Sequence, residues 1–261
     1  MNHDHAQQAA ELLWKTWTEE RRIDAIPEML RPVSRADGYQ IQQQMAEQSG
    51  QATVGWKIAA TSVAGQKHLQ VDGPLAGRLL ANRVHPDGTL IVLGGNAMRV
   101  AEAEFAFRLG RDLPPRSQPY ELAEVMAAID TLHPAIEIPD SRYQDFCIVG
   151  SPQLIADNAC AHHFVLGAAT TTDWRAIDLA AHVVRTSLDG VAARDGIGAN
   201  VLGDPRLAMT WIANELRQHN IGLRAGDVVT TGTSIVPIPI QLGSHIRADF
   251  GCIGTVTTQL V

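Results

Sequence analysis

The segment from Val100 to Leu109 limits the fold of this chain most narrowly, because its side chains alternate as they do along a β-strand. One face of that strand carries only alanine, phenylalanine and leucine, at Ala101, Ala103, Phe105, Phe107 and Leu109. Glu102 and Glu104 therefore share the opposite face, roughly 6–7 Å apart along the strand, where both can reach one cation. Two other interpretations stay open: both glutamates are solvated, or Arg108 pairs with Glu104.

A third carboxylate, Glu137, lies in a short apolar run that is bounded by prolines. An ionised carboxylate is costly to bury alone, so Glu137 between Ile136 and Ile138 needs a partner. A divalent cation shared with the two strand glutamates would be one. Ligation by oxygen alone favours a hard ion such as Mg²⁺ or Mn²⁺ over zinc.

Lysine is scarce in this chain, with only Lys15, Lys57 and Lys67 among 21 basic residues. Lys57 lies in the middle of a β-prone run at residues 52–62. The environment can tune a lysine to titrate, whereas an arginine keeps its proton. Lys57 is thus a candidate catalytic residue, and the alternative is a lysine at a strand end whose ammonium group reaches solvent.

Composition excludes several classes of partner. The formal charge of −7 argues against a nucleic acid or an anionic membrane surface. No segment approaches the roughly 18 apolar residues of a membrane span, and the N-terminus lacks a signal-peptide pattern. We therefore expect a cytoplasmic protein.

The three cysteines, Cys147, Cys160 and Cys252, are far apart and suit a reducing compartment. The run Cys160-Ala-His-His163 is a weak zinc candidate, because adjacent histidines on a regular element point in different directions. Gly196–Gly203 is not a nucleotide loop, because its third glycine is misplaced for a Rossmann fingerprint.

Helices and strands are mixed without a βαβ pattern. Periodicity and capping residues predict helices at residues 6–22, 36–48, 119–133, 174–181 and 205–220, with a short one after 65. Ser34 or Asp37 is the expected cap of the second helix, and Asp204 that of the last. Asp189-Gly190 predicts a hairpin, and short strands follow residue 226. We expect an α+β fold with a helical N-terminal lead-in at residues 1–50 and a catalytic domain at residues 51–261.

Six motifs spread over nearly the whole chain have a joint order and spacing that point to one family. They are Gly55-Trp-Lys-Ile58 with Thr61-Ser62, Glu102-Ala-Glu104, Glu137-Ile-Pro-Asp-Ser-Arg142, Ala156-Asp-Asn158, Leu202-Gly-Asp-Pro205 with Trp211, and Ala225-Gly-Asp227 with Thr231-Gly-Thr233. The chain thereby resembles the 2-keto-4-pentenoate hydratase branch of the fumarylacetoacetate hydrolase superfamily, which also contains 4-oxalocrotonate decarboxylases.

This resemblance implies a mixed β-roll core with peripheral helices. It implies that Glu102, Glu104 and Glu137 hold Mg²⁺ or Mn²⁺ and that Lys57 is the active-site lysine. It assigns substrate binding to Thr61, Ser62, Asp157, Thr231, Gly232 and Thr233. The implied substrates are 2-oxo or 2-hydroxy-enoates, and the implied assembly is a homo-oligomer that can also bind another enzyme of its pathway.

The implied reaction is hydration of a 2-hydroxy-2,4-dienoate to a 4-hydroxy-2-oxo acid in the catabolism of aromatic compounds, with Lys57 moving a proton or stabilising charge. Alternatives are a decarboxylase of 4-oxalocrotonate-type diacids, an acylpyruvate carbon–carbon hydrolase and a non-catalytic scaffold. Family members often carry Gly-Leu where this chain has Ala59-Ala60, and an acidic residue where it has Leu75-Ala76-Gly77. Because the acid lies near the substrate's reacting end in the family, these departures leave hydration versus decarboxylation open.

Overall fold

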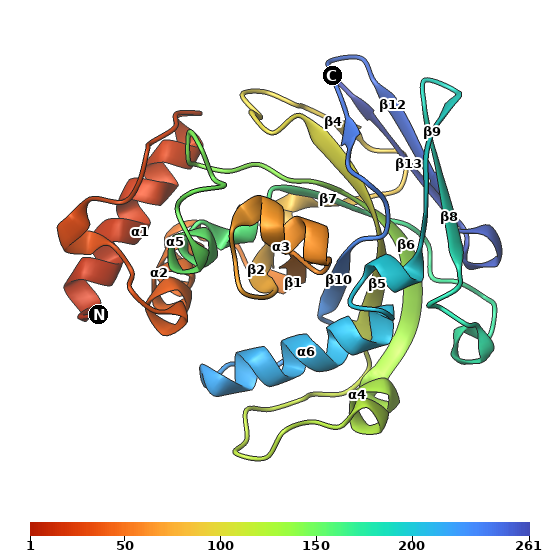
Figure 1. Ribbon diagram of the computed structural model, residues 1–261, viewed down its shortest axis with the longest axis horizontal. Coiled ribbons are helices and arrows are strands. Elements are labelled where there is room, and N and C mark those ends of the chain that lie inside the picture. The colour runs from red at the N-terminus through yellow and green to blue at the C-terminus, as the bar shows by residue number, and fades with distance from the viewer.

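The computed structural model describes residues 1–261 (Figure 1). Its α-helices are α1 (His3–Thr18), α2 (Arg35–Gln48), α3 (Val63–Leu69), α4 (Leu122–Ala128), α5 (Ser151–Ala156) and α6 (Pro205–Gln218). Its strands are β1 (Thr53–Ala59), β2 (Leu75–Leu80), β3 (Val84–Pro86), β4 (Leu90–Ile91), β5 (Val100–Leu109), β6 (Ile129–Ile138), β7 (His163–Leu166), β8 (Val183–Leu188), β9 (Val191–Ile197), β10 (Val228–Thr233), β11 (Ile238–Pro239), β12 (His245–Asp249) and β13 (Thr255–Leu260). No helix combines the length and the apolar character needed to cross a membrane.

The strands form two mixed sheets. The larger has the order β2-β1-β10-β5-β6-β7-β3, with β11 also paired to β5, and the smaller has the order β4-β13-β12-β8-β9. Most neighbours are antiparallel, but β1 with β10, β3 with β7 and β4 with β13 are parallel. In Figure 1, β6 curves between α4 and α6 below and the smaller sheet above. The predicted α+β fold, a β-roll with peripheral helices, is confirmed.

The N-terminal helices α1 and α2 pack together at the left of Figure 1. Leu13, Trp17 and Ile41 are among the side chains of their shared apolar cluster. The predicted cap of α2 is present, because Ser34 and Asp37 form a reciprocal capping box. The first helix ends at Thr18, four residues before the predicted boundary.

Two predicted helices are wrong over most of their length. The helix expected at 119–133 is limited to α4, because from Ile129 onward the chain pairs with β5 as strand β6. At 174–181 there is only a 3₁₀ turn, Trp174–Ala176, after which Ile177 is extended. In the first case the apolar helical pattern starts at Leu122 and Val125 and continues past Ile129, but the pairing of β6 with β5 outweighs it there.

Two other local predictions are confirmed. Strands β8 and β9 form a hairpin through Asp189 and Gly190, whose φ angles of 54° and 80° suit a two-residue turn with positive φ at both positions. Helix α6 begins at Pro205, and the Asp204 side chain accepts a hydrogen bond from the Arg206 amide.

A partly buried chain of side-chain nitrogens from Arg83, His163 and His85 joins β7 to β3. His163 Nε2 lies 3.2 Å from Arg83 Nη1, and His163 Nδ1 lies 3.0 Å from His85 Nε2. Arginine can only donate, so Nε2 of His163 is the acceptor and its Nδ1–H donates to His85. Burial, with the nearby charge of Arg83, lowers the pKa of His163 to about 3. The folded protein therefore keeps this imidazole neutral.

Acid should destabilise the protein through His163. Below pH 6.5 this imidazole binds a proton in the unfolded chain, whereas in the folded chain it stays neutral down to about pH 3. The free energy of unfolding therefore falls as the pH decreases from 6.5 to 3, and at pH 5 the loss is about 2 kcal/mol. Urea denaturation of His163→Gln should show a smaller loss between pH 7.5 and pH 5 than wild type. The exposed His245 provides the control, since His245→Gln should retain the wild-type loss. Equal losses in all three proteins would contradict the assignment.

Candidate active site

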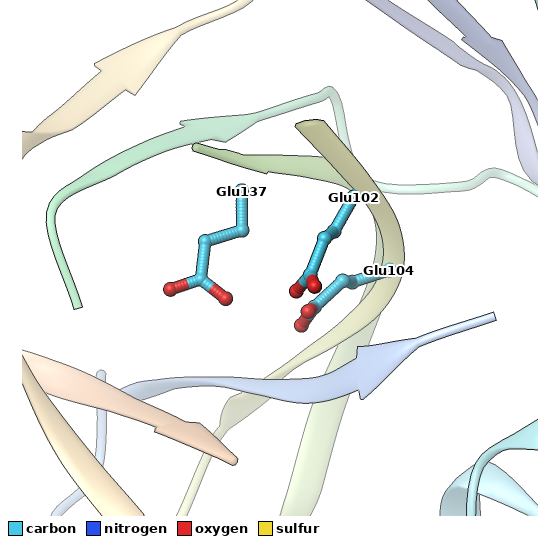
Figure 2. Close-up of side chains that lie close together, drawn as sticks. All are labelled: Glu102, Glu104 and Glu137. Carbon is cyan, nitrogen blue, oxygen red and sulfur yellow. The ribbon is translucent and has the colours of Figure 1, made fainter. Parts of the chain in front are cut away.

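Three glutamates from neighbouring strands converge in the larger sheet. Glu102 and Glu104 lie on β5, and the sheet register places Glu137 of β6 directly opposite Glu102. One carboxylate oxygen from each lies within 4.8 Å of those of the other two. Figure 2 shows the three carboxylates pointing into the same space. Like charges placed opposite each other in a sheet are unfavourable, so this cluster requires compensation.

Part of that compensation is visible and part is missing. Glu104 Oε2 accepts hydrogen bonds from Thr230 Oγ1 and from the Gly232 amide, the latter at 2.9 Å. Three buried carboxylate oxygens accept no hydrogen bond, Glu104 Oε1 and both oxygens of Glu137. Only Glu137 Oε1 among them has a charged partner, the Lys57 ammonium at 3.1 Å. The alternative pairing of Arg108 with Glu104 is wrong, because Arg108 donates to the Gly226 carbonyl instead.

The electrostatics of the cluster favour a bound cation. Burial raises the pKa of all three carboxyls, although the positive charge of Lys57 opposes this rise. The pKa of Glu137 is raised to about 7. For Glu104, the negative charges of Glu137 and Glu102 add to the effect of burial. Carboxylates held together in this way bind protons, or a cation, more readily than isolated ones. The two orphaned oxygens and the all-oxygen donor set therefore fit a hard divalent ion.

Lys57 is held in the interior beside this cluster. The residue is 2% exposed, so the interpretation of a solvent-reaching lysine is wrong. Its ammonium lies 3.1 Å from Glu137 Oε1 and donates to the Ala159 carbonyl at 2.8 Å. Burial alone would lower the pKa of Lys57, but Glu137 and Glu102 outweigh it and the net shift is upward. Lys57 is therefore a fixed positive charge in this site.

The Ala159 carbonyl is positioned by an unusual backbone segment. Asn158, Ala159 and Cys160 all have left-handed φ angles, at 55°, 49° and 61°. Such angles are unfavourable for residues with a Cβ atom and occur mainly where the surroundings enforce them. The Asn158 side chain anchors the segment, because its amide bonds both the N–H and the carbonyl of Arg78 on β2. Asn158 belongs to one of the six sequence motifs, whereas Ala159 was not predicted to act at the site.

Asp157 lies behind this segment and does not line the cavity beside the glutamates. It is fully buried in an ion pair with Arg142, and Ser141 Oγ donates to it at 2.6 Å. The Arg142 guanidinium also lies 4.3 Å from the centre of the Trp17 ring, which links the N-terminal helices to this network. Asp157 is thus placed to hold the chain rather than to touch a ligand.

Gly77 on β2 allows the left-handed segment to approach the sheet. A Cβ atom at this position would overlap the Asn158 carbonyl oxygen. Gly77→Ala should therefore displace the segment and lower the free energy of unfolding by about 1–3 kcal/mol, the usual effect of overpacking. Gly73→Ala is the matched control, because a Cβ there meets nothing within 4 Å. Thermal or urea denaturation of both variants tests this, and equal stability would contradict it.

A cavity of about 620 Å³ adjoins Lys57 and Glu102. Of the predicted substrate-binding residues, Thr61, Ser62 and Thr233 line it, whereas Thr231, Gly232 and Asp157 do not. Thr231 Oγ1 donates to the Phe105 carbonyl. Gly232 has a φ of 93°, and a Cβ atom there would overlap Thr61 Oγ1, so glycine is needed for this close approach.

The other motifs singled out in the sequence form no second centre. Cys160 is buried and its thiol has a raised pKa from burial, while His162 and His163 pack ring against ring with lowered pKa values. The segment Gly198–Asn200 is a single 3₁₀ turn. Asn200 does line the cavity, although its side chain donates to the Ser234 carbonyl.

The chain is similar to several known proteins. Residues 52–261 match the fumarylacetoacetate hydrolase C-terminal family. A 2-keto-4-pentenoate hydratase of Burkholderia vietnamiensis is 35% identical over 83% of this chain and 81% of its own. A 2-hydroxyhexa-2,4-dienoate hydratase of Comamonas testosteroni is 34% identical over 85% of each chain. The structure of 4-oxalocrotonate decarboxylase from Pseudomonas putida G7, complexed with magnesium and adipate, is similar with a TM-score of 0.90 at 26% identity, covering 100% of this chain and 99% of that one.

Proposed function

The chain belongs to the fumarylacetoacetate hydrolase C-terminal family, and from that premise we propose that it is a lyase that adds water to a 2-hydroxy-2,4-dienoate, giving a 4-hydroxy-2-oxo acid. The hydratases among its relatives support this assignment. The observation that carries it is the cluster of three converging carboxylates and one fixed ammonium beside a largely apolar cavity, which Glu102 and Lys57 line.

We assign Mg²⁺ or Mn²⁺ to Glu102, Glu104 and Glu137. The orphaned oxygens of Glu104 and Glu137 support this assignment, as does a donor set made only of carboxylates. When bound, the ion would supply positive charge to the carboxylate and the C2 oxygen of a 2-hydroxy acid. The related decarboxylase structures contain magnesium or calcium.

Lys57 is assigned to the C2 oxygen of the substrate. An ammonium group has three N–H donors; one is donated to the Ala159 carbonyl, and a second faces Glu137, with which Lys57 forms an ion pair. The third is free for an oxygen in the cavity, where it stabilises negative charge as the C2 hydroxyl loses its proton and C5 gains one. Thr61, Ser62 and Thr233 offer polar groups around the head of the substrate, and the apolar walls exclude bulk water from the diene.

Decarboxylation of a diacid is the second candidate, because of the similarity to the decarboxylase structure. A second carboxylate at the far end of the substrate would need a positively charged or hydrogen-bonding partner in the cavity. Only Lys57 and His68 among the lining side chains can carry positive charge, and Lys57 lies at the glutamate end. The lining thus favours a monoacid and hydration. Acylpyruvate hydrolysis ranks third, and a catalytically silent scaffold would not need a buried Lys57 among three glutamates.

The test is an ultraviolet assay of two compounds, 2-hydroxypenta-2,4-dienoate and 2-oxohex-3-enedioate, each with Mg²⁺ or with excess chelator. We expect Mg²⁺-dependent loss of the dienoate with formation of 4-hydroxy-2-oxopentanoate and no CO₂. Release of CO₂ from the diacid at a higher kcat/KM would favour the decarboxylase. Full activity in chelator with no metal in the protein would exclude the proposed centre.

The wider setting is also proposed. We place the enzyme in the catabolism of aromatic compounds in the cytoplasm, as a homo-oligomer that can associate with another enzyme of the pathway. Sedimentation equilibrium measures the first association. Co-purification with the enzyme that produces or consumes its substrate measures the second.

A further inference from the structure

The cavity is far larger than a five-carbon dienoate requires. Its volume of about 620 Å³ equals that of roughly twenty water molecules at 30 Å³ each. Of the three glutamates and Lys57, only Glu102 and Lys57 line it, among 24 lining residues. Most of this volume therefore lies beyond the atoms on which the proposed hydration takes place.

The remainder of the wall is apolar and comes from several separate segments. Its main members are Leu69 and Ala64 of α3, Met98, Phe146 and Val236. The one ionisable group among them is His68, whose Nε2 lies 3.4 Å from Cys147 Sγ. No arginine and no second lysine lines the cavity. A charged tail would thus lose its hydration with only His68 as a possible counter-charge, whereas a hydrocarbon tail would gain by leaving water.

Helix α3 forms part of this wall, but none of its side chains is fully buried in the protein core. Its Ala64 and Leu69 face the cavity. Val236, which also lines the cavity, is 67% exposed. Aliphatic side chains that line a water-exposed cavity are stabilised when a hydrocarbon ligand covers them, because apolar surface is then removed from water.

We propose that this cavity accepts 2-hydroxy-2,4-dienoates that bear a bulky, uncharged alkyl or aryl group beyond C5, and that Leu69, Phe146 and Val236 form the subsite for that group. The inference rests on the proposed hydratase function and names its substrate class. Longer hydrocarbon tails are then better substrates, by about fourfold in kcat/KM for each buried methylene. A carboxylate at the end of the tail removes the gain.

The experiment compares kcat/KM for the 2-hydroxy-2,4-dienoates with five, six, eight and ten carbons, for the 6-phenylhexadienoate and for the six-carbon dienedioate, all with saturating Mg²⁺. We expect the ten-carbon and phenyl compounds to exceed the five-carbon compound at least tenfold. We expect the dienedioate to be poorer than the six-carbon monoacid. Product identification by mass spectrometry verifies hydration in every case.

A pair of variants on α3 locates the subsite. Ala64→Leu fills part of the cavity from an exposed helical position, so it should lower the ratio of ten-carbon to five-carbon kcat/KM at least tenfold. Lys67→Leu adds the same side chain to the same helix outside the cavity lining and should leave that ratio unchanged.

The outcomes separate the two claims. If the five-carbon compound is hydrated but kcat/KM stays flat or falls with tail length, the inference is overturned and the hydratase assignment stays intact. Absence of hydration of every dienoate would overturn both. An equal effect of Ala64→Leu and Lys67→Leu would place the subsite elsewhere and refute the assignment to α3.

Discussion

Glu104→Gln is expected to weaken Mg²⁺ binding at least about 100-fold and to abolish measurable hydration, while making the metal-free protein more stable. Glu104 Oε2 accepts from Thr230 and Gly232, and a glutamine oxygen can keep both bonds. The glutamine amide nitrogen then takes the place of Oε1, which accepts no hydrogen bond in the wild-type protein. This nitrogen is only a donor, so its N–H groups would point at the cation instead of a ligand oxygen. Loss of an outer partner alone typically costs 10–100-fold in metal affinity, so loss of a charged ligand costs at least as much.

The stability change has the opposite sign. The pKa of Glu104 is raised well above its usual 4.5 by burial and by Glu137 and Glu102, so ionising it destabilises the metal-free fold increasingly as the pH rises above 4.5. Glutamine never ionises. The variant should therefore be more stable than wild type at pH 8 in chelator, and the difference should shrink toward pH 4.5.

Calorimetric titration with Mn²⁺ or Mg²⁺ measures the affinity, and urea denaturation in chelator measures the stability. Glu124→Gln is the matched control, because Glu124 is an exposed surface carboxylate that pairs with Arg116. It should leave both quantities near those of wild type. A Glu104→Gln protein that binds metal as tightly as wild type would remove Glu104 from the metal site.

The fold was predictable where local signals agreed with long-range pairing. The alternation at Val100–Leu109 identified β5, and the caps at Ser34 and Asp204 located two helices. The prediction failed at Ile129, where a helical pattern continues but the backbone pairs with β5. Periodicity describes one segment at a time and contains no information about the strand that will lie beside it.

The same limit applies to the site. Its charged residues could be found, because a carboxylate or a lysine in an apolar strand needs an explanation. That Glu137 lies opposite Glu102 follows only from the register of β5 and β6. The Ala159 carbonyl that receives Lys57 depends on left-handed backbone at Ala159 and Cys160, residue types that give no local sign of positive φ.

Lys57→Met is expected to lower kcat about 10²–10⁴-fold, the usual range for a positioned charge or proton donor. Methionine keeps most of the length of the side chain but removes the ammonium that lies between Ala159 and Glu137. Metal affinity should stay near wild type or rise, because the ammonium competes with a cation for Glu137. The metal-free variant should lose about 3–5 kcal/mol, since Glu137 is then buried without a counter-charge, so kcat is measured at saturating Mg²⁺.

Lys57→Arg should not restore the rate. Lys57 is 2% exposed, and Gly77 approaches both its side chain and the Asn158 carbonyl, so the larger planar guanidinium has no room to direct one N–H to a substrate oxygen. Lys15→Met, at an exposed position of α1, is the control and should retain wild-type kcat. Circular dichroism shows whether each variant is folded. A folded, metal-saturated Lys57→Met protein with kcat within a few-fold of wild type would show that the buried ammonium only balances the charge of Glu137 and takes no part in the reaction.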